Sequence, residues 1–407
     1  MNMKVLLVST NYSPELTGVG KYSGEMVEWL ADQGHDVRVI CAPPYYPEWK
    51  VGEGYSAWSY RKEISNNKRV YRCPLWVPSQ PSGLKRIIHL LSFAITSFPV
   101  LLMQLFWRPK VVICVEPPLF NSFGSLLVAK LTRAKSILHI QDFEVDAAFE
   151  LGIVKAGWLK KSIYGFERFL MRRFDRVSTI SEAMQKKLTD KNIDSSKQLF
   201  FPNWVDTSFI YPLDTISNYR QELKIPLDTV VALYSGNMGE KQGLEIVIQA
   251  AEQLKNENIQ FIMCGSGAAM EWLKELALGL DNIMWLPLQP FEALNEFLNL
   301  ADIHLLPQQA GAADLVMPSK LTGMLSSGRA TVATAMVGTQ VESVVKQFGI
   351  VVPPADVDAF SEAILTLSKD VGLRESFGVK AREYAETHLE YDAIMRNLEM
   401  ELQKIIK

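Results

Sequence analysis

The chain has 407 residues, of which 48% are hydrophobic and 21% are charged. This length exceeds what one hydrophobic core usually supports, and the composition excludes a disordered chain, so we expect two folded domains. The formal net charge of -3 excludes a generally basic surface, and we expect no nucleic-acid partner. The four cysteines are far apart and mostly in apolar runs, which predicts small core residues in a reducing compartment. The N-terminal apolar stretch is too short for a signal peptide, so we expect a cytoplasmic protein.

The first predicted strand, MKVLLVS, leads into the glycine loop NYSPELTGVGKYSGEM at residues 11–26. A strand followed by a glycine-rich loop and a helix aims backbone N–H groups at an anion, usually a phosphate. The spacing G-x-G-x-x-x-G differs from the dinucleotide fingerprint, and the second strand, DVRVICA, is not followed by the acidic residue which that fingerprint requires. Gly18 and Gly20 therefore predict either a phosphate cradle or a plain turn.

An aromatic loop, PPYYPEWKVGEGYSAWSY, follows at residues 43–60. The sequence alone fits both exposed and buried aromatic rings in this loop. The rings of Tyr45, Tyr46, Trp49 and Trp58 could stack on acceptor sugars, lie at a lipid headgroup layer, or pack the loop itself.

Two later segments of the first half could contact a membrane. Residues 87–107, IIHLLSFAITSFPVLLMQLFW, are nearly long enough to span a bilayer but contain several polar side chains. They predict a buried crossover helix or a helix that lies in the plane of the membrane, rather than a spanning one. Residues 160–176, KKSIYGFERFLMRRFDR, combine six basic side chains with three phenylalanines, which fits either an anionic lipid surface or a solvated helix face.

Short β-branched runs alternate with amphipathic stretches along both halves of the chain, a pattern typical of parallel sheets covered by helices. The rhythm breaks near residues 201–212, FPNWVDTSFIYP, and then restarts. We expect an N-terminal domain at residues 1–205 and a second domain at residues 206–372. Residues 373–407 are predicted to be helical and could return to the first domain.

The second half has three glycine-bearing strand ends. In YSGNMGEKQGLE, Gly236 and Gly239 precede Lys241, which adds a positive charge, and in FIMCGSGAAM the pair Gly265 and Gly267 repeats the arrangement. Together with the third element these predict a diphosphate ligand at the carboxyl ends of the strands.

The third element is GAADLVMPSKLTGMLSSG, residues 311–328. Pro318 suits the first turn of a helix, which predicts free backbone N–H groups at Ser319, Lys320 and Leu321 facing an anion. The Lys320 ammonium adds charge, and Asp314 just upstream could accept hydrogen bonds from hydroxyl groups.

These motifs resemble those of the retaining glycosyltransferases of the GT-B fold, family 4 or group 1. The likeness covers nearly the whole chain and is strongest to the capsule and exopolysaccharide branch that includes the fucosyltransferase of the colanic acid pathway. It is carried by NYSPELTGVGKYSGEM, CAPPYYPEW, LHIQDFEVDA, FPNW, YSGNMGEKQGLE and GAADLVMPSKLTGML. The resemblance implies two Rossmann-like doubly wound α/β domains facing a cleft, with the acceptor bound by the first domain and a nucleotide-diphosphate sugar by the second.

The resemblance also implies roles for individual residues. Catalysis is assigned to Asp142, as the residue that positions the sugar or accepts a proton, and to Lys241, Asp314 and Lys320 around the diphosphate. Asp142 could instead cap a helix. The donor-binding residues implied are Gly18, Gly20, Gly236, Asn237, Gly239, Gly265, Gly267, Ser319 and Leu321.

The chain departs from the family pattern in two places. Gly323 occupies the position of the second of two glutamates that many members carry, and Leu315 occupies that of the first, next to Asp314. Gln141 precedes Asp142 where many members have histidine, with His139 two residues earlier and on the same strand face.

No cofactor or metal is expected. The Asp-Val-Asp sequence at 356–358 opens a helical pattern, which predicts a helix cap rather than a metal ligand. The function expected is sugar transfer from GDP-fucose or a UDP-sugar to a lipid-diphosphate-linked saccharide, at the anionic inner face of the cell membrane. The alternatives are a nicotinamide-dependent nucleotide-sugar oxidoreductase and a catalytically lapsed binding subunit.

Overall fold

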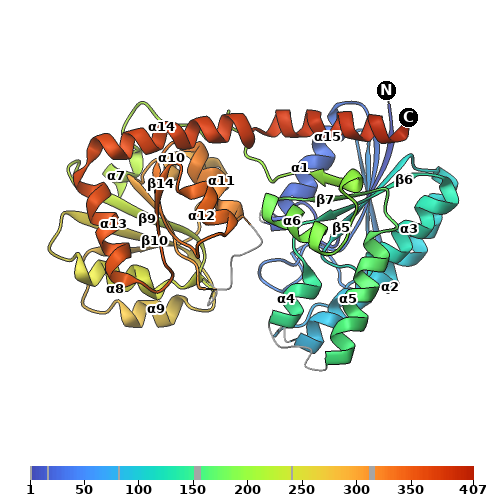
Figure 1. Cartoon of the computed structure of the whole chain (residues 1–407), viewed down its shortest axis with the longest axis horizontal. Coiled ribbons are helices and arrows are strands. Elements are labelled where there is room, and N and C mark those ends of the chain that lie inside the picture. Colours follow the sequence, from blue (N-terminus) through green and yellow to red (C-terminus); the bar gives the residue numbers. More distant parts are fainter. Residues whose placement is uncertain (1, 16–17, 81–82, 151–156, 240–241, 311–316) are drawn as a thin grey trace. The chain divides into compact units, whose positions relative to one another are not determined.

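The structure is a computed structural model that describes residues 2–15, 18–80, 83–150, 157–239, 242–310 and 317–407 (Figure 1). The chain divides into two compact units. The N-terminal unit comprises Met1–Pro202 with Ala393–Lys407, and the C-terminal unit comprises Asn203–Asp392. Each unit is an α/β domain built on one sheet.

The N-terminal unit is built on an eight-stranded sheet of order β3-β4-β2-β1-β5-β6-β7-β8. All neighbouring strands are parallel except β3 and β4, which form an antiparallel hairpin at one edge. The strands are β1 (Lys4–Val8), β2 (Asp36–Cys41), β3 (Arg61–Ser65), β4 (Lys68–Arg72), β5 (Val111–Glu116), β6 (Lys135–Ile140), β7 (Arg176–Thr179) and β8 (Gln198–Phe200). The order reverses between β1 and β5, and such a reversal is where open α/β sheets bind ligands.

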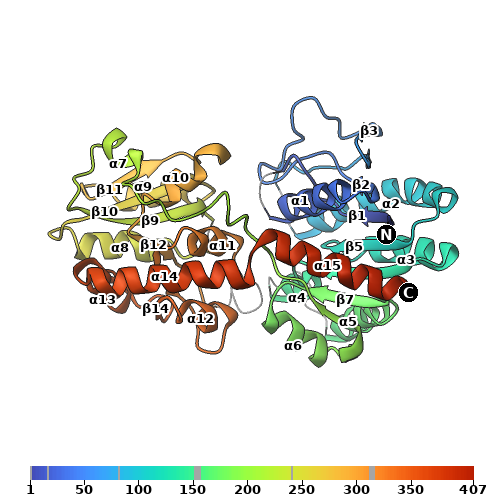
Figure 2. The same cartoon turned by 90° about the horizontal axis from the view of Figure 1, so that it is seen from above.

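Helices cover both faces of this sheet (Figures 1 and 2). Helices α2, α3 and α5 lie on one side of the sheet, and α1 and α15 lie on the other (Figure 1). The helices are α1 (Gly18–Asp32), α2 (Gly83–Trp107), α3 (Asn121–Thr132), α4 (Glu144–Glu150), α5 (Gly157–Met171), α6 (Glu182–Asp190), the 3-10 turn η1 (Ser195–Lys197) and α15 (Tyr391–Ile406). His35 Nε2 lies 3.2 Å from Glu399 Oε1, which ties α15 to the end of α1.

The C-terminal unit is built on six strands, all parallel, in the order β11-β10-β9-β12-β13-β14. They are β9 (Val230–Asn237), β10 (Ile259–Ser266), β11 (Ile283–Leu286), β12 (Ile303–Leu306), β13 (Ala330–Thr334) and β14 (Gly349–Val352). The helices are α7 (Asn218–Glu222), α8 (Glu245–Gln253), α9 (Met270–Leu276), η3 (Phe291–Ala293), α10 (Leu294–Leu298), α11 (Ser319–Ser326), α12 (Gln340–Val345), α13 (Val357–Lys369) and α14 (Val371–His388).

Two apolar layers sandwich this second sheet. Helices α8, α9 and α13 contribute to a core on one face, which includes Phe261 and Phe360. Helices α11, α12 and α14 contribute to a core that includes Leu321 and Phe348. Because consecutive strands are buried on both faces, they consist of near-continuous apolar runs such as VVALY in β9. The switch in strand order falls between β9 and β12, where α8 and α11 leave toward opposite faces. Two doubly wound α/β domains were the expected fold class, and the expectation is confirmed.

Candidate donor-binding site

Glycines at the carboxyl ends of β9 and β10 bring two backbones unusually close together. Gly236 and Gly265 are register partners, with φ of 145° and 148°. A Cβ on Gly265 would overlap the carbonyl oxygen of Gly236, and a Cβ on Gly267 would overlap that of Met238. Side chains would also be strained at these dihedral angles, so glycine is required at Gly265 near the end of β10 and at Gly267 just after it. The backbones of the two strand ends can therefore approach each other closely.

Lys320 lies directly beside this surface. Its Nζ is 4.1 Å from the centroid of the Tyr234 ring, and its Cδ would lie 3.5 Å from a Cβ on Gly236. The side chain is partly buried, and burial lowers the pKa of its ammonium from 10.5 to about 7. The ring face of Tyr234 stabilises the protonated form, but no carboxylate is paired with it among the described residues. A partly desolvated cation at the switch point of a parallel sheet is suited to hold a diphosphate.

The remaining residues expected in this region have defined contacts. The Tyr234 hydroxyl donates to the carbonyl oxygen of Asn237 over 2.5 Å, which fixes the end of β9. The backbone N–H of Gly239 donates to Oε1 of Gln242 over 3.1 Å. The structure therefore brings Gly236, Asn237, Gly265 and Lys320 together. The sequence analysis did not predict a role for Tyr234. An aromatic residue two positions before a strand-end glycine is a pattern from which it could be found.

The start of α11 differs in one respect from the expectation. The helix begins at Ser319 and Pro318 precedes its first turn. The backbone N–H of Leu321 already donates to the carbonyl oxygen of Pro318 over 2.9 Å. Leu321 therefore offers no free amide to an anion, because the first turn closes on itself. Lys241 and Asp314 lie outside the described residues.

The two glycines of the N-terminal glycine loop have different surroundings within the chain. Gly20 lies in the first turn of α1, and a Cβ there would be 2.5 Å from Glu15 Oε2 and 2.6 Å from Glu15 Cβ. Gly20 thus makes room for a carboxyl group of the chain itself. This contact is enough to explain a glycine at this position without a bound diphosphate. Gly18 has φ of 56° with no heavy atom within 4 Å of an added Cβ, so it is required by backbone conformation.

Asp142 and its neighbours lie at the end of β6. Asp142 is exposed, whereas His139 and Gln141 are buried. The expected shared face of the last two is confirmed, because the Gln141 amide lies 2.8 Å from His139 Nε2. His139 Nδ1 lies 2.9 Å from the Ser178 hydroxyl, and burial lowers the pKa of the imidazole to about 3. His139 is therefore neutral at physiological pH and holds Gln141 in place.

Glu116 is a residue at the switch point of the first sheet that the sequence did not single out. It ends β5 and is fully buried, and neither carboxyl oxygen has a hydrogen-bond partner in the described part of the chain. Burial, followed by the charges of Glu167 and Glu144, raises the pKa of Glu116 well above its usual range. Burial without a hydrogen-bond partner therefore favours the neutral form of this carboxyl group.

Metal chemistry has no obvious site in the described ranges, where no group of three or more histidine, cysteine or acidic side chains could hold an ion. Asp356 caps α13 by accepting a hydrogen bond from the Ala359 backbone N–H over 3.0 Å. The expected helix cap at this Asp-Val-Asp sequence is confirmed. All four cysteines are buried and free, as expected for core residues.

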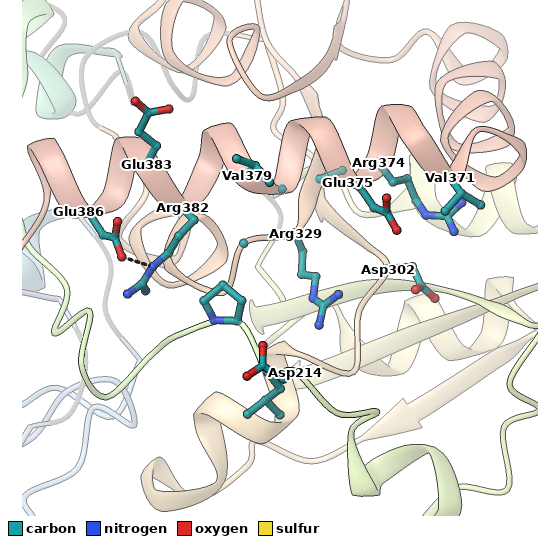
Figure 3. Close-up of a pocket in the computed structure, with 15 residues that line it drawn as sticks. Asp214, Asp302, Arg329, Val371, Arg374, Glu375, Val379, Arg382, Glu383 and Glu386 are labelled. Carbon is teal, nitrogen blue, oxygen red and sulfur yellow. Dashed lines mark hydrogen bonds and ion pairs between the residues drawn. The ribbon is translucent and has the colours of Figure 1, made fainter.

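A pocket of about 830 Å³ lies at the end of the second sheet opposite the strand-end glycines (Figure 3). Asp302 and Arg329 line it immediately before β12 and β13, that is, at the amino ends of the strands. Arg329 donates to Asn299 Oδ1 over 3.0 Å, and Arg382 from α14 pairs with Glu386 over 2.7 Å. Because α/β sheets bind ligands at the carboxyl ends of strands, this pocket is separate from the Lys320 site.

The aromatic loop divides into a packed and an exposed set. Tyr45 is buried and contacts Trp49 and His89, with ring centroids 5.7 Å and 4.8 Å away. Tyr46 and Trp58 are 40% and 78% exposed. Packing therefore explains Tyr45 and Trp49 but not Tyr46 and Trp58.

Helix α2, which contains the long apolar segment, is a crossover between β4 and β5 with two different faces. In the described ranges it is a helix long and apolar enough to cross a membrane, although only 33% of its most apolar window is buried. The buried face includes Phe93, Ser97 and Gln104, so the polar side chains point into the unit. The exposed face carries Leu84, Ile88, Leu91, Ile95, Met103 and Phe106.

Comparisons with known proteins agree with this geometry. The model of the family described as "Glycosyl transferase 4-like domain" matches residues 17–204, and that of "Glycosyl transferases group 1" matches residues 215–384. The structure is similar to sucrose-phosphate synthase from Thermosynechococcus elongatus, with a TM-score of 0.76, 17% identity and 99% of each chain covered. It is also similar to HepE from Anabaena, solved with UDP and glucose, with a TM-score of 0.71, 14% identity, and 99% and 100% of the two chains covered. The fold is GT-B.

In sequence, the chain is 45% identical over 404 residues to WcaI of Escherichia coli strain K12, whose name assigns it to colanic acid biosynthesis as a glycosyl transferase. The match covers 97% of this chain and 98% of that protein. The chain therefore belongs to the family 4, or group 1, glycosyltransferases, and it is an enzyme of that class.

Proposed function

We propose that the protein transfers a sugar, with retention of configuration, from a nucleotide-diphosphate sugar to a lipid-diphosphate-linked saccharide in the biosynthesis of a colanic-acid-type exopolysaccharide. GDP-fucose or a UDP-sugar is the donor. The observation that carries the proposal is the placement of Lys320 over Tyr234, beside the Gly236 and Gly265 strand ends. The 45% identity to WcaI supports the choice of pathway.

In the proposed reaction the oxygen of an acceptor hydroxyl bonds to the anomeric carbon on the face from which the diphosphate departs. The anomeric C–O bond to the diphosphate breaks, and the hydroxyl proton passes to the released nucleoside diphosphate. The protein must stabilise the negative charge that develops on the leaving group, and Lys320 is placed to do this. Asp142, exposed at the end of β6, orients the sugar or relays the proton.

The test is release of nucleoside diphosphate from GDP-fucose and from a set of UDP-sugars, with and without farnesyl-diphosphate-linked monosaccharides. Acceptor-dependent release with transfer of the sugar supports the proposal. Lys320→Ala should reduce it, whereas Lys346→Ala, at an exposed lysine paired with Glu342, should not. A folded protein that binds a nucleoside diphosphate but transfers nothing is the outcome that favours a binding subunit.

We further propose that the enzyme works on the anionic inner face of the cell membrane. Helices α2, α3 and α5 lie on the same side of the first sheet (Figure 1), and α3 and α5 share an apolar cluster that includes Leu126 and Leu170. In addition to the apolar face of α2, Phe123 of α3 and the pair Phe166 and Phe169 of α5 are exposed. Basic side chains accompany them, with the Arg173 guanidinium 3.3 Å from the Phe169 ring centroid. Apolar side chains flanked by cations are suited to an anionic bilayer surface.

Sedimentation with vesicles tests this location. The protein should co-sediment with vesicles containing anionic lipid, less so as salt is raised, because charge supplies part of the attraction. Replacing Lys160, Lys161, Arg172 and Arg173 by Gln should release it, and so should Phe106→Asp. Replacing four exposed lysines of the C-terminal unit (Lys255, Lys346, Lys369 and Lys380) by Gln is the matched control. Binding that ignores lipid charge and all of these changes would refute the proposal.

A further inference from the structure

Glu15 joins the two loops that follow β1 and β2. Its side chain is 6% exposed. Oε1 accepts hydrogen bonds from the backbone N–H groups of Tyr45 and Tyr46, both over 3.0 Å, and Oε2 accepts one from the Asn11 amide over 2.9 Å. Burial raises the pKa of this carboxyl group, and the bonds from Tyr45 and Tyr46 oppose that shift. One carboxyl group thus connects residue 11 of the glycine loop to residues 45 and 46 of the aromatic loop.

Two neighbours reinforce this connection. Gly20 leaves the space that the Glu15 side chain occupies. Arg72, 4% exposed, donates to the carbonyl oxygens of Ser13 over 2.7 Å and Ala42 over 3.1 Å, so a second side chain spans the same two loops. Both loops leave the carboxyl ends of adjacent parallel strands. The buried side chains of Glu15 and Arg72 therefore both hold these two loops together, although the loops lie about thirty residues apart in the chain.

As a result, the exposed ring of Tyr46 is carried by a backbone that is held in place. Tyr46 is 40% exposed, whereas the adjacent Tyr45 is buried. The positive charge of Arg86, in the first turns of α2, acts on the Tyr46 hydroxyl and lies 5.5 Å from the Trp49 ring centroid. Beyond Arg86, the exposed side chains of α2 are apolar. Tyr46 offers an aromatic face, Arg86 a cation and α2 an apolar strip. In this order the three features match the sugar, the diphosphate and the lipid of a lipid-linked saccharide.

We propose that Tyr46 stacks on the acceptor saccharide and that Glu15 is a positioning residue that holds it there, with Arg86 facing the acceptor diphosphate. This inference rests on the proposed function for the identity of the ligand. A ring whose backbone is already fixed by two hydrogen bonds to a carboxyl group loses less conformational entropy when a sugar binds. The apolar face of the ring matches the C–H face of a sugar, and its hydroxyl remains free to bond.

The experiment compares Tyr46→Ala, Glu15→Gln and Arg86→Gln with Tyr211→Ala, a control at a tyrosine of the C-terminal unit that is 44% exposed. The probes are farnesyl-diphosphate-linked glucose, galactose and N-acetylglucosamine, with calorimetric titration of binding beside the transfer assay. Tyr46→Ala and Arg86→Gln should each raise the acceptor Kd and KM about tenfold or more, with the donor KM unchanged. Glu15→Gln should do the same and should also speed hydrogen exchange at the backbone amides of Tyr45 and Tyr46.

The outcomes separate this inference from the proposed function. Wild-type acceptor affinity in Tyr46→Ala overturns the stacking role, and wild-type acceptor KM in Glu15→Gln despite faster amide exchange reduces Glu15 to a structural role. If the protein transfers no sugar but binds the probes, and Tyr46→Ala abolishes that binding, the proposed function fails while the site stands. If the protein binds none of the probes, the acceptor site is refuted.

Discussion

Donor affinity should fall as pH rises through the pKa of Lys320. Burial lowers that pKa from 10.5 to about 7, and the ammonium is 4.1 Å from the Tyr234 ring centroid without a carboxylate partner among the described residues. A diphosphate binds the protonated form, and its charge raises the pKa again once it is bound. Binding nucleoside diphosphate near neutral pH must therefore take up a proton.

The size of the effect follows from the protonated fraction. Because the apparent Kd is the intrinsic Kd divided by that fraction, the Kd should be about twofold weaker at pH 7, tenfold at about pH 8 and a hundredfold at about pH 9. The stability of the unliganded protein should change in the opposite direction. A folded-state pKa below the unfolded value means that the unfolded chain binds more protons, so this group raises the free energy of unfolding as pH rises from about 7 to 10.5.

Calorimetry with UDP and GDP from about pH 6 to about pH 9, in buffers of different ionisation enthalpy, measures both the Kd and the proton uptake. Lys320→Gln should bind weakly with a flat pH profile and without that proton uptake, whereas Lys346→Gln should behave as wild type. A flat profile in the wild-type protein, or an unchanged slope in Lys320→Gln, would refute the reasoning.

Three further predictions concern catalysis and stability. Lys241→Ala and Lys320→Ala should each lower turnover by about one to three powers of ten with the fold retained, as steady-state kinetics and circular dichroism would show, and wild-type rates would contradict their assigned role. Gly265→Ala should lower the free energy of unfolding in urea by about 2 kcal/mol or more, because its Cβ meets backbone. Gly279→Ala, also at positive φ but in open space, should lower it by about 1 kcal/mol. Equal losses would contradict the crowding argument. Lys191→Met should destabilise by about 3–5 kcal/mol in the same assay because it leaves the buried Glu167 carboxylate without its ion-pair partner and Asp146 with Lys187 alone, and a loss below about 1 kcal/mol would show that the ion pairs contribute little.

The sheets were predictable because most of their strands are buried on both faces. Runs such as VVICVE and VVALY have few alternatives to a central parallel strand, and both are strands in the structure. The hairpin β3–β4 was not predicted. Its sequences, RKEIS and KRVYR, are rich in charged residues without regular alternation, and β3 is mostly exposed, so the local pattern resembles a polar loop. Only its pairing with β2 at the sheet edge makes it a strand.

The candidate site was predictable to the extent that it is local. Strand-end glycines and the lysine after Pro318 can be read from a few adjacent letters, and the structure brings them together. Glu15 could not be found in this way, because the amide groups that it accepts from lie 30 and 31 residues away. The same limit applies to Gly20, whose neighbour Glu15 was not visible in the glycine pattern. A glycine pattern shows that something approaches the backbone closely, but the approaching group is set by the fold.

Gly323 illustrates how a departure from a family pattern can be explained by packing. The resemblance places a glutamate at this position in many members. Here Gly323 lies in α11, and a Cβ would be 3.3 Å from Leu298 Cδ1 of α10, which is tighter than ordinary van der Waals contact. The adjacent α11 residues Leu321 and Leu325 are fully buried, so the helix cannot shift outward without opening the core. The close approach of α10 and α11 therefore takes the place of a polar contact. In the proposed donor site, contacts to the ribose would therefore come from residues outside this turn, and Lys320, on the preceding turn, would supply the positive charge for the diphosphate.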